Sequence, residues 1–309
     1  MKILVTGATG FVGSCLTRRL IGDGHDVHLL VRRDSDRWRI ADLAPFFTAR
    51  EVDLRDAAAV EKAVAEIAPR VIFHLATYGG FAFQKEEADI IDSNFIGTVN
   101  LLNACAKAGF DSFVNTGSSS EYGVKGGPMT EQDLPEPVGA YGVSKAAATL
   151  YCRSLAVERD LPVTTVRLFS PYGPWDDPRR LIPSVIVSLL RGEAPRLASP
   201  DSVRDFVFVD DIVDMYLKLA AHPLTGEIIN AGSGRQHCIG EVVATIAGLV
   251  GDSPAPCWGA IGSSRPEPKV WVADVARARE KLNWVPTTSL REGLAKTVAW
   301  FETNLGLYA

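Results

Sequence analysis

Residues 2–13 read KILVTGATGFVG, and this stretch decides the fold. Its aliphatic first half predicts a buried strand, and glycines at positions 7, 10 and 13 lead from that strand into a helix. Such glycines permit a tight turn, and the helix N-terminus directs free N–H groups at an anion. At the start of an α/β domain this arrangement is typical of a dinucleotide pyrophosphate site. We therefore expect Gly7, Gly10, Phe11, Val12 and Gly13 to bind a cofactor.

Strands and helices alternate through the following residues. Apolar runs predict strands at 27–31, 71–75, 112–116 and 163–168, and helical periodicity predicts helices at 11–22, 60–68, 94–108 and 141–159. Strands that are apolar throughout belong to parallel sheets covered on both faces. The sequence thus predicts an α/β fold with a doubly wound parallel Rossmann sheet.

The alternation ends near residue 168, where prolines and glycines become frequent. We expect residues 1–168 and about 206–248 to form the dinucleotide-binding domain. Residues of about 169–205 and 249–309 should form a smaller C-terminal α/β substrate-binding region.

Composition and charge exclude several classes of protein. The 309 residues carry a net charge of −5 with no basic run, so nucleic acid is not an expected partner. The five cysteines are dispersed without metal-like spacing. We therefore expect no bound metal, and we expect the cysteines to be reduced thiols. The apolar run at the N-terminus is too short for a signal core, and no stretch approaches the roughly 18 apolar residues of a membrane span. We expect a cytoplasmic protein without a membrane segment.

The end of the second predicted strand bears on the choice of cofactor. An enzyme that binds NAD usually carries Asp or Glu there to bind the adenosine ribose, but this chain has Val31 followed by Arg32 and Arg33. Guanidinium groups suit a 2′-phosphate, which a carboxylate would repel. We expect NADP(H), with NAD(H) as the alternative if these arginines are only surface charges near Asp34.

Two polar motifs suggest the chemistry. Tyr141 and Lys145 are four residues apart, so they share one face of the long predicted helix. Lys145 and the helix N-terminus would favour the phenolate of Tyr141, which could exchange a proton with a hydroxyl or carbonyl while hydride moves to or from nicotinamide. Residues 117–123 read GSSSEYG after a predicted strand, at the edge where parallel sheets bind ligands.

The glycine turn, serine cluster and Tyr–Lys helix, in this order, resemble the extended short-chain dehydrogenases/reductases. That family includes nucleotide-sugar epimerases, dehydratases and ketoreductases, and the resemblance covers nearly the whole chain. It implies that Ser118, Tyr141 and Lys145 are catalytic, with Ser119 as the alternative to Ser118. Tyr141 and Lys145 would also bind the cofactor. The family further implies a homodimer through the helices at 94–108 and 141–159.

The resemblance also implies other binding residues. Asp53 and Leu54 match a segment that contacts adenine, and Leu75, Ala76 and Thr77 match a strand end beside the cofactor. Arg204 and Arg265 lie in segments whose arginines hold the diphosphate of a nucleotide sugar. Ser119, Ser120 and Ser170 would contact this substrate, although Ser170 replaces an Asn that is common in the family.

The expected reaction follows from the same motifs. A dehydratase needs an acid pair where this chain has Ser119 and Ser120, and Glu121 lies one residue late. The absent ribose acid and the GSSSEYG motif resemble reductases of 4-keto-6-deoxy sugar nucleotides. NADPH-dependent reduction of the C4 ketone of such a substrate is our first prediction. An NAD-dependent nucleotide-sugar 4-epimerase is the main alternative, and a reductase of other ketones or a non-catalytic NADP-sensing protein is less favoured.

Overall fold

Seven parallel strands form the central sheet of the computed structural model, in the order β11-β6-β5-β4-β1-β2-β3. The structure describes residues 1–81, 83–251, 253–262 and 268–308. The chain builds outward from β1 to β3, then returns to the other side of β1, so the strand order reverses between β1 and β4. The predicted doubly wound Rossmann fold is confirmed, and ligands bind such sheets at the carboxyl ends of the strands beside this reversal. The strands are β1 (Lys2–Thr6), β2 (Asp26–Val31), β3 (Phe47–Glu51), β4 (Val71–His74), β5 (Ser112–Ser118), β6 (Val163–Leu168) and β11 (Ile228–Ala231).

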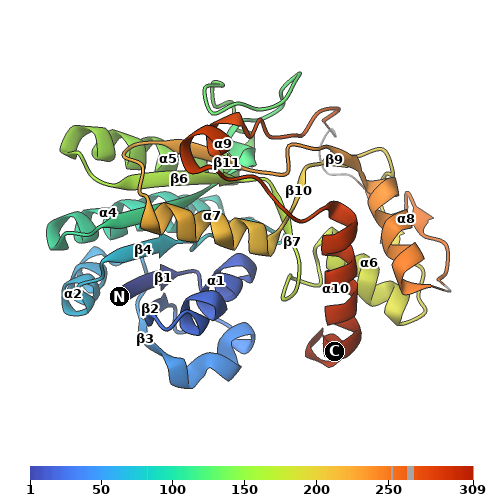
Figure 1. Cartoon of the computed structure of the whole chain (residues 1–309), viewed down its shortest axis with the longest axis horizontal. Coiled ribbons are helices and arrows are strands. Elements are labelled where there is room, and N and C mark those ends of the chain that lie inside the picture. Colours follow the sequence, from blue (N-terminus) through green and yellow to red (C-terminus); the bar gives the residue numbers. More distant parts are fainter. Residues whose placement is uncertain (82, 252, 263–267, 309) are drawn as a thin grey trace.

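Helices cover both faces of the sheet (Figure 1). One face packs against α1 (Phe11–Gly22), α7 (Val209–Ala221) and α9 (Ala276–Leu282). The other packs against α2 (Ala57–Ile67), α4 (Gly97–Ala108) and α5 (Gly139–Arg159). Successive side chains of a strand point to opposite faces, and because both faces are buried, the centre of β1 (Ile3, Leu4 and Val5) is apolar throughout. Among the described residues, none of the helices has the length and apolar character needed to cross a bilayer.

A second, smaller lobe lies beside the sheet, at the right in Figure 1. Helices α6 (Leu181–Leu190), α8 (Ile239–Val250) and α10 (Leu290–Asn304) share one core there with Tyr172, Phe206 and Phe208. Helix α8 therefore packs in this lobe, whereas α9 packs against the sheet; the exact division of the chain into domains stays a prediction. Paired short strands complete this part: β7 (Ser170–Tyr172) with β10 (Phe206–Phe208), β9 (Val203–Arg204) with β12 (His237–Cys238), and β8 (Arg196–Leu197) with β13 (Cys257–Trp258). The chain continues after α10 into the short helix η4 (Leu305–Tyr308).

Several element bounds differ from the predicted ones. The strand β3 is largely exposed at the sheet edge, so its sequence FTARE lacks the apolar signal of a buried strand. Helix α2 begins three residues early, because Asp56 accepts a hydrogen bond from Ala59 N at 3.0 Å and caps it. The helix predicted at 94–108 is composite: α3 (Glu87–Ile91) runs through a π-helical turn, η2 (Asp92–Ile96), into α4. Such turns are often found at functional sites.

Candidate functional site

The glycine turn after β1 lies against the end of β4. Gly7 has φ +72°, and a Cβ there would lie 2.5 Å from Ala76 N and from the Leu75 carbonyl carbon. A Cβ on Gly13 would lie 2.2 Å from Gly7 O. Only glycine fits at these positions. Gly10 is the N-cap of α1 and has no side chain to cap the N–H groups of the first helical turn. The structure therefore brings the predicted cofactor residues of both strand ends together.

A buried chain of hydrogen bonds supports this junction. Ala76 N donates to Thr6 Oγ1 at 3.3 Å, and Thr6 Oγ1 lies 2.6 Å from His74 Nδ1. On the other side of the ring, His74 Nε2 lies 2.8 Å from Thr98 Oγ1, which itself donates to Asn94 O at 2.6 Å. Burial lowers the pKa of His74 to about 3, with a further contribution from the charge of Lys145, so the ring is neutral near pH 7. Since the Thr98 hydrogen is used on Asn94 O, His74 carries its proton on Nε2.

Asn94, in the π-helical turn, connects the β4 loop to α5. Its Oδ1 accepts from Tyr78 N at 2.7 Å and from Thr77 Oγ1 at 3.2 Å. Its Nδ2 donates to Tyr78 O at 2.8 Å and to Ser144 Oγ at 3.0 Å. Ser144 precedes the predicted catalytic Lys145. From the sequence, His74 was only part of the segment matched to the strand end beside the cofactor, and Asn94 had no predicted role. The available signal for both was a polar residue inside an otherwise apolar strand or helix face.

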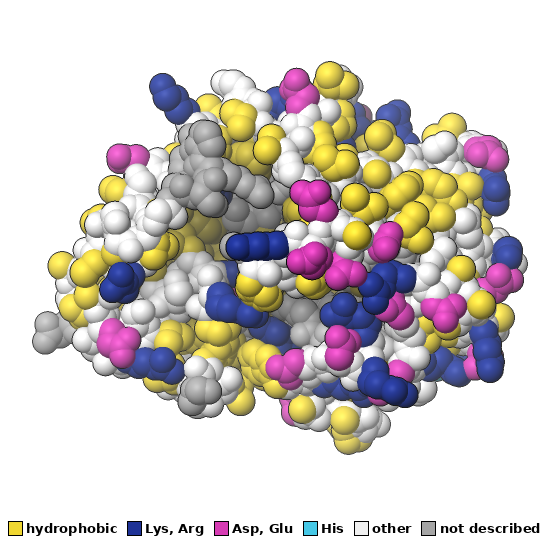
Figure 2. Space-filling view, turned by 180° about the vertical axis from the view of Figure 1, so that it is seen from behind, with side chains coloured by type: hydrophobic (Ala, Val, Ile, Leu, Met, Phe, Trp, Pro, Cys, Tyr) yellow, Lys and Arg dark blue, Asp and Glu magenta, His cyan; other side chains and the backbone are white. Residues whose placement is uncertain are grey.

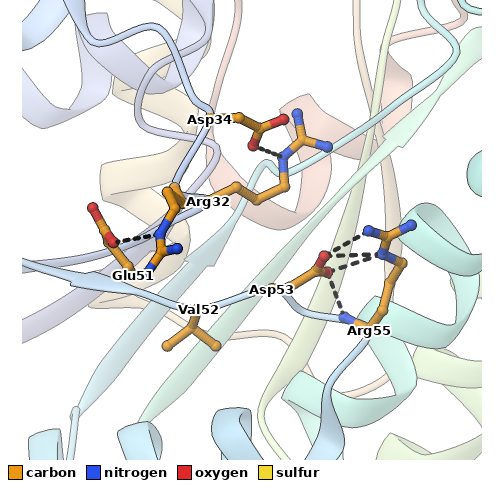
Figure 3. Close-up of a pocket in the computed structure, with 7 residues that line it drawn as sticks. Arg32, Asp34, Glu51, Val52, Asp53 and Arg55 are labelled. Carbon is orange, nitrogen blue, oxygen red and sulfur yellow. Dashed lines mark hydrogen bonds and ion pairs between the residues drawn. The ribbon is translucent and has the colours of Figure 1, made fainter.

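A cavity of about 390 Å³ lies at the ends of β2 and β3 (Figure 3). It brings together the predicted residues Arg32, Arg33 and Asp53, and its other lining residues are Asp34, Glu51, Val52 and Arg55. Two of its ion pairs are long, at 3.6 Å for both Arg32 Nε–Asp34 Oδ1 and Arg33 Nε–Glu51 Oε2.

Asp53 is engaged more tightly than these arginines. It accepts from Arg55 Nη2 at 2.7 Å and from Arg55 N at 2.9 Å, and these bonds with Arg55 lower the pKa of its carboxyl group. Leu54 does not line the cavity; its side chain packs close to Gly97 at the start of α4. Asp53 is thus a partner of Arg55 in this cavity, whereas Arg32 and Arg33 hold their acidic neighbours loosely.

The predicted catalytic residues come from β5 and α5. Ser118 ends β5, and its Oγ accepts from Ser120 N at 3.1 Å, which caps the short helix η3 (Ser119–Glu121). Helix α5 packs against this turn, since a Cβ on Gly142 would lie 2.8 Å from Ser120 O. Lys145 is buried on α5, and Tyr141 is partly exposed one turn earlier.

Glu121 is directed into the protein interior, toward Arg167. Its side chain is fully buried, and Oε2 accepts from Arg167 Nε at 2.7 Å. Positions 119 and 120, where a dehydratase would carry its acid pair, are serines. In this conformation Glu121 cannot replace that pair at the substrate.

A second cavity, of about 290 Å³, lies between β7, β10 and the α6–α8 lobe. Ser170 and Arg204 line it as predicted, together with apolar side chains such as Leu197, Phe206 and Ile239. Arg265, the other predicted substrate arginine, lies outside the described residues. Figure 2 shows the molecule from behind, where the surface is hollowed and Lys and Arg side chains gather around the hollow.

Arg180 also lines this second cavity, and sequence analysis did not single it out. Its Nε lies 3.7 Å from Asp176 Oδ1, and its guanidinium lies over the ring of Phe81, 5.1 Å from the centroid. Phe81 belongs to the loop that follows β4. Burial raises the pKa of Asp176 to about 7. Arg180 therefore spans from the second cavity to the strand-end loop, and its acidic partner only partly neutralises it.

Comparison with known proteins gives a consistent result. Residues 3–232 match the model of the "NAD dependent epimerase/dehydratase family". A UDP-glucose 4-epimerase of Mycolicibacterium smegmatis is 34% identical over 98% of this chain and 99% of its own length. A dTDP-glucose 4,6-dehydratase of Neisseria meningitidis is 28% identical over 98% of this chain and 94% of its own.

Solved structures similar to this chain include nucleotide-sugar 4-epimerases. A UDP-glucose 4-epimerase of Thermotoga maritima, solved with UDP-glucose, has a TM-score of 0.91 and 30% identity, covering 99% of this chain and 100% of the other. A UDP-glucuronic acid 4-epimerase of Bacillus cereus, solved with UDP-glucuronic acid and NAD, has a TM-score of 0.87 and 26% identity, covering 98% of this chain and 100% of the other.

Proposed function

The chain belongs to the NAD dependent epimerase/dehydratase family and is an oxidoreductase-type enzyme, and from this premise we propose that it is a nucleotide-sugar 4-epimerase. The similarity to UDP-sugar 4-epimerases carries this choice, and it supports the epimerase, the alternative from the sequence, over the ketoreductase that we put first. A dehydratase is disfavoured because its acid pair is replaced by Ser119 and Ser120, and Glu121 is buried against Arg167.

A nucleotide-diphosphate sugar fits the chemistry of the second cavity. Apolar walls can cover a base, and Arg180 and Arg204 supply positive charge for phosphate oxygens in a protein of net charge −5. The solved relatives with UDP-glucose and UDP-glucuronic acid support this class of substrate. We propose that the sugar lies between this cavity and the end of β5.

The residues of the glycine turn fit a dinucleotide. A side chain at Gly7 or Gly13 would collide with neighbouring backbone, so the turn keeps backbone open to a pyrophosphate at the start of α1. A dinucleotide held by Gly7, Gly10 and Gly13 would supply reversible hydride transfer at C4 of the sugar. NAD in the solved Bacillus cereus relative supports NAD as the retained cofactor of an epimerase.

The chain's own residues would move the proton. Tyr141 would take the proton of the C4 hydroxyl as hydride leaves, and would give it back when hydride returns to the opposite face of the keto sugar. Ser118 Oγ would hold the C4 oxygen by a hydrogen bond. Lys145, which is buried on α5 one turn after Tyr141, would bind the nicotinamide ribose.

Net reduction with NADPH is a second candidate, favoured by one observation. Arg32 and Arg33 line the first cavity, and each lies 3.6 Å from its acidic partner. Strand β2 ends in Val31, where an NAD enzyme usually has an Asp or Glu that binds the adenosine ribose. A 2′-phosphate could replace these weak pairs. If the protein binds NADP(H) and consumes it with a 4-keto nucleotide sugar, the reductase is the correct assignment.

The two candidates are separated by one assay. Purified protein is incubated with UDP-glucose or UDP-glucuronate without added cofactor, and the sugars are resolved by chromatography. An epimerase forms the C4 epimer with no net change in nicotinamide absorbance at 340 nm. Absence of epimer from a panel of UDP-, dTDP-, GDP- and CDP-sugars, together with consumption of NADPH on a 4-keto sugar, would reject the epimerase.

We also propose a homodimer. Val143, Leu150 and Val157 are exposed on α5 at every seventh position, and Ile91 and Ile96 are exposed on the adjoining α3 and η2. A repeat of seven keeps these side chains on one helix face, where a second copy could cover them.

A further inference from the structure

We propose that Glu121 is a positioning residue, which fixes the Ser118 hydroxyl relative to Tyr141 and Lys145. This inference rests on the proposed function, because it assigns Ser118 a contact with the reacting oxygen. Glu121 is fully buried and therefore cannot touch substrate itself.

The carboxylate of Glu121 joins three elements. Oε1 accepts from Ser118 N at 2.8 Å, at the end of β5, and from Thr149 Oγ1 at 3.0 Å, on α5. Oε2 accepts from Arg167 Nε at 2.7 Å, on β6. One side chain thus ties the backbone of the predicted catalytic serine to the neighbouring strand and to the catalytic helix.

The bond to α5 falls on the relevant face of that helix. Tyr141, Lys145 and Thr149 follow one another at intervals of four residues, so their side chains lie along one face. A hydrogen bond at Thr149 therefore fixes the distance of this face from β5. Burial raises the pKa of the Glu121 carboxyl group, and the charges of Arg167 and Lys145 oppose that rise.

The surroundings leave Glu121 no alternative position. A Cβ on Gly117 would lie 2.5 Å from Glu121 Oε1, so the carboxylate occupies space that any side chain at position 117 would fill. Arg167 is buried, with its guanidinium 4.4 Å from the ring centroid of Tyr122, and its Nη1 has no hydrogen-bond partner among the described residues. Glu121 is therefore the counterion of a cation that cannot reach water, and the pair is held in one geometry.

The variant E121Q tests the proposal. Its amide oxygen can accept from Ser118 N or from Arg167, but the NH₂ group on the other side cannot accept at all. The strand end should lose its fixed position, and misplacement of a reacting group by about 1 Å costs on the order of 100-fold in rate. We expect kcat for epimerisation to fall about 10- to 100-fold, with KM for the nucleotide sugar changed by less than about threefold.

The decisive measurement is a double-mutant cycle with S118A. If Glu121 acts through Ser118, E121Q costs much less kcat in the S118A background than in wild type, because the hydroxyl that it positions is already absent. A purely structural role gives the same factor in both backgrounds, and that result would overturn the proposal. D211N is the matched control: Asp211 is also buried, and it accepts from Thr287 N at 2.9 Å and Thr288 N at 3.2 Å in another part of the chain. It should lower Tm without the loss in kcat.

Further variants keep the test decisive. T149V removes only the bond from Glu121 to α5 and preserves the ion pair with Arg167, so it replaces E121Q if that variant does not fold. We expect kcat of T149V to fall about three- to tenfold. An unchanged kcat overturns the proposal. If wild type turns over no nucleotide sugar, the proposed function fails separately. Crystal structures of wild type and T149V then decide the inference: a shifted distance between Ser118 Oγ and the Tyr141 phenol supports it, and an unchanged one overturns it.

Discussion

The ring of His74 joins β4 to α4 through a 2.8 Å hydrogen bond between its Nε2 and Thr98 Oγ1. On the opposite side, Nδ1 accepts from Thr6 Oγ1 at 2.6 Å, at the end of β1. The ring is buried between these two hydroxyl groups, and burial disfavours its charged form. Protonation of Nδ1 would remove the acceptor of the Thr6 bond, so this link between the ends of β1 and β4 depends on the neutral ring.

This arrangement predicts a pH dependence of stability. The pKa of His74 is lowered from 6.5 to about 3 in the folded protein, so the unfolded chain binds the proton more readily. The stabilisation is fully present above about pH 6.5 and is lost as pH falls toward 3, at up to about 1.4 kcal/mol per pH unit. Urea unfolding at pH 7.0, 5.5 and 4.5 should show this slope in wild type and a shallower one in H74N, which does not titrate. Equal slopes would contradict it.

The fold was predictable from the sequence where burial leaves a clear pattern. Strand β6 and helix α1 have the predicted bounds, because apolar runs and nearby glycines mark the ends of such elements. Strand β3 was missed because an exposed edge strand needs few apolar residues. The π-helical turn was missed because one additional residue per turn leaves no mark in a hydrophobic period.

The catalytic assignment predicts separate effects for two variants. Y141F removes the proton-transfer group and should lower kcat about 100- to 10,000-fold, while nucleotide-sugar binding is retained. S118A removes one hydrogen bond and should cost less than Y141F. Initial rates and isothermal titration of the substrate on both variants check this, and Y141F with near wild-type kcat would remove Tyr141 from the mechanism.

Residues that define motifs could be located from the sequence, whereas the residues that support them could not, and the catalytic roles stay predictions. Ser118, Tyr141 and Lys145 lie on elements that pack together, as their motifs suggested. The partnerships of Asn94 and Glu121 depend on which strands and helices become neighbours, and these pairings span 50 and 46 residues of the chain, to Ser144 and Arg167 respectively. Spacing along the sequence carries no information about such contacts.

The first cavity predicts how the protein distinguishes cofactors. In R32A, a 2′-phosphate loses a charge-assisted hydrogen bond, worth about 1.5–3 kcal/mol, so affinity for NADP(H) should fall about 10- to 100-fold. Affinity for NAD(H) should change less than about threefold. Fluorescence titration of cofactor-free protein measures both, and R37A is the matched control, because Arg37 pairs with Glu51 at 2.9 Å but does not line the cavity. Equal losses for both cofactors would show that Arg32 does not contact a 2′-phosphate.

The apolar face of α5 predicts the oligomeric state. Wild type should elute as a dimer, and L150D, which places a charge at the centre of this face, should give a monomer. Analytical ultracentrifugation measures both, and V124D is the control, since Val124 is exposed outside α5. A monomeric wild type would remove the dimer proposal.

The second cavity predicts a loss of substrate affinity in R180Q. Arg180 is held by Asp176 only at 3.7 Å, and burial raises the pKa of that acid to about 7, so much of its charge is absent near neutral pH. The guanidinium is thus available to an anionic substrate, and R180Q should raise KM for a nucleotide sugar about 10-fold or more while kcat changes less. Comparison of UDP-glucose with UDP-glucuronate locates the contact: equal losses indicate the diphosphate, and a larger loss for UDP-glucuronate indicates the sugar carboxylate. R179Q is the control, because Arg179 pairs tightly with Asp177 at 2.7 Å and does not line the cavity. If R180Q and R179Q have the same KM as wild type, the substrate does not reach Arg180, and the proposed path of the sugar from this cavity to Ser118 is wrong.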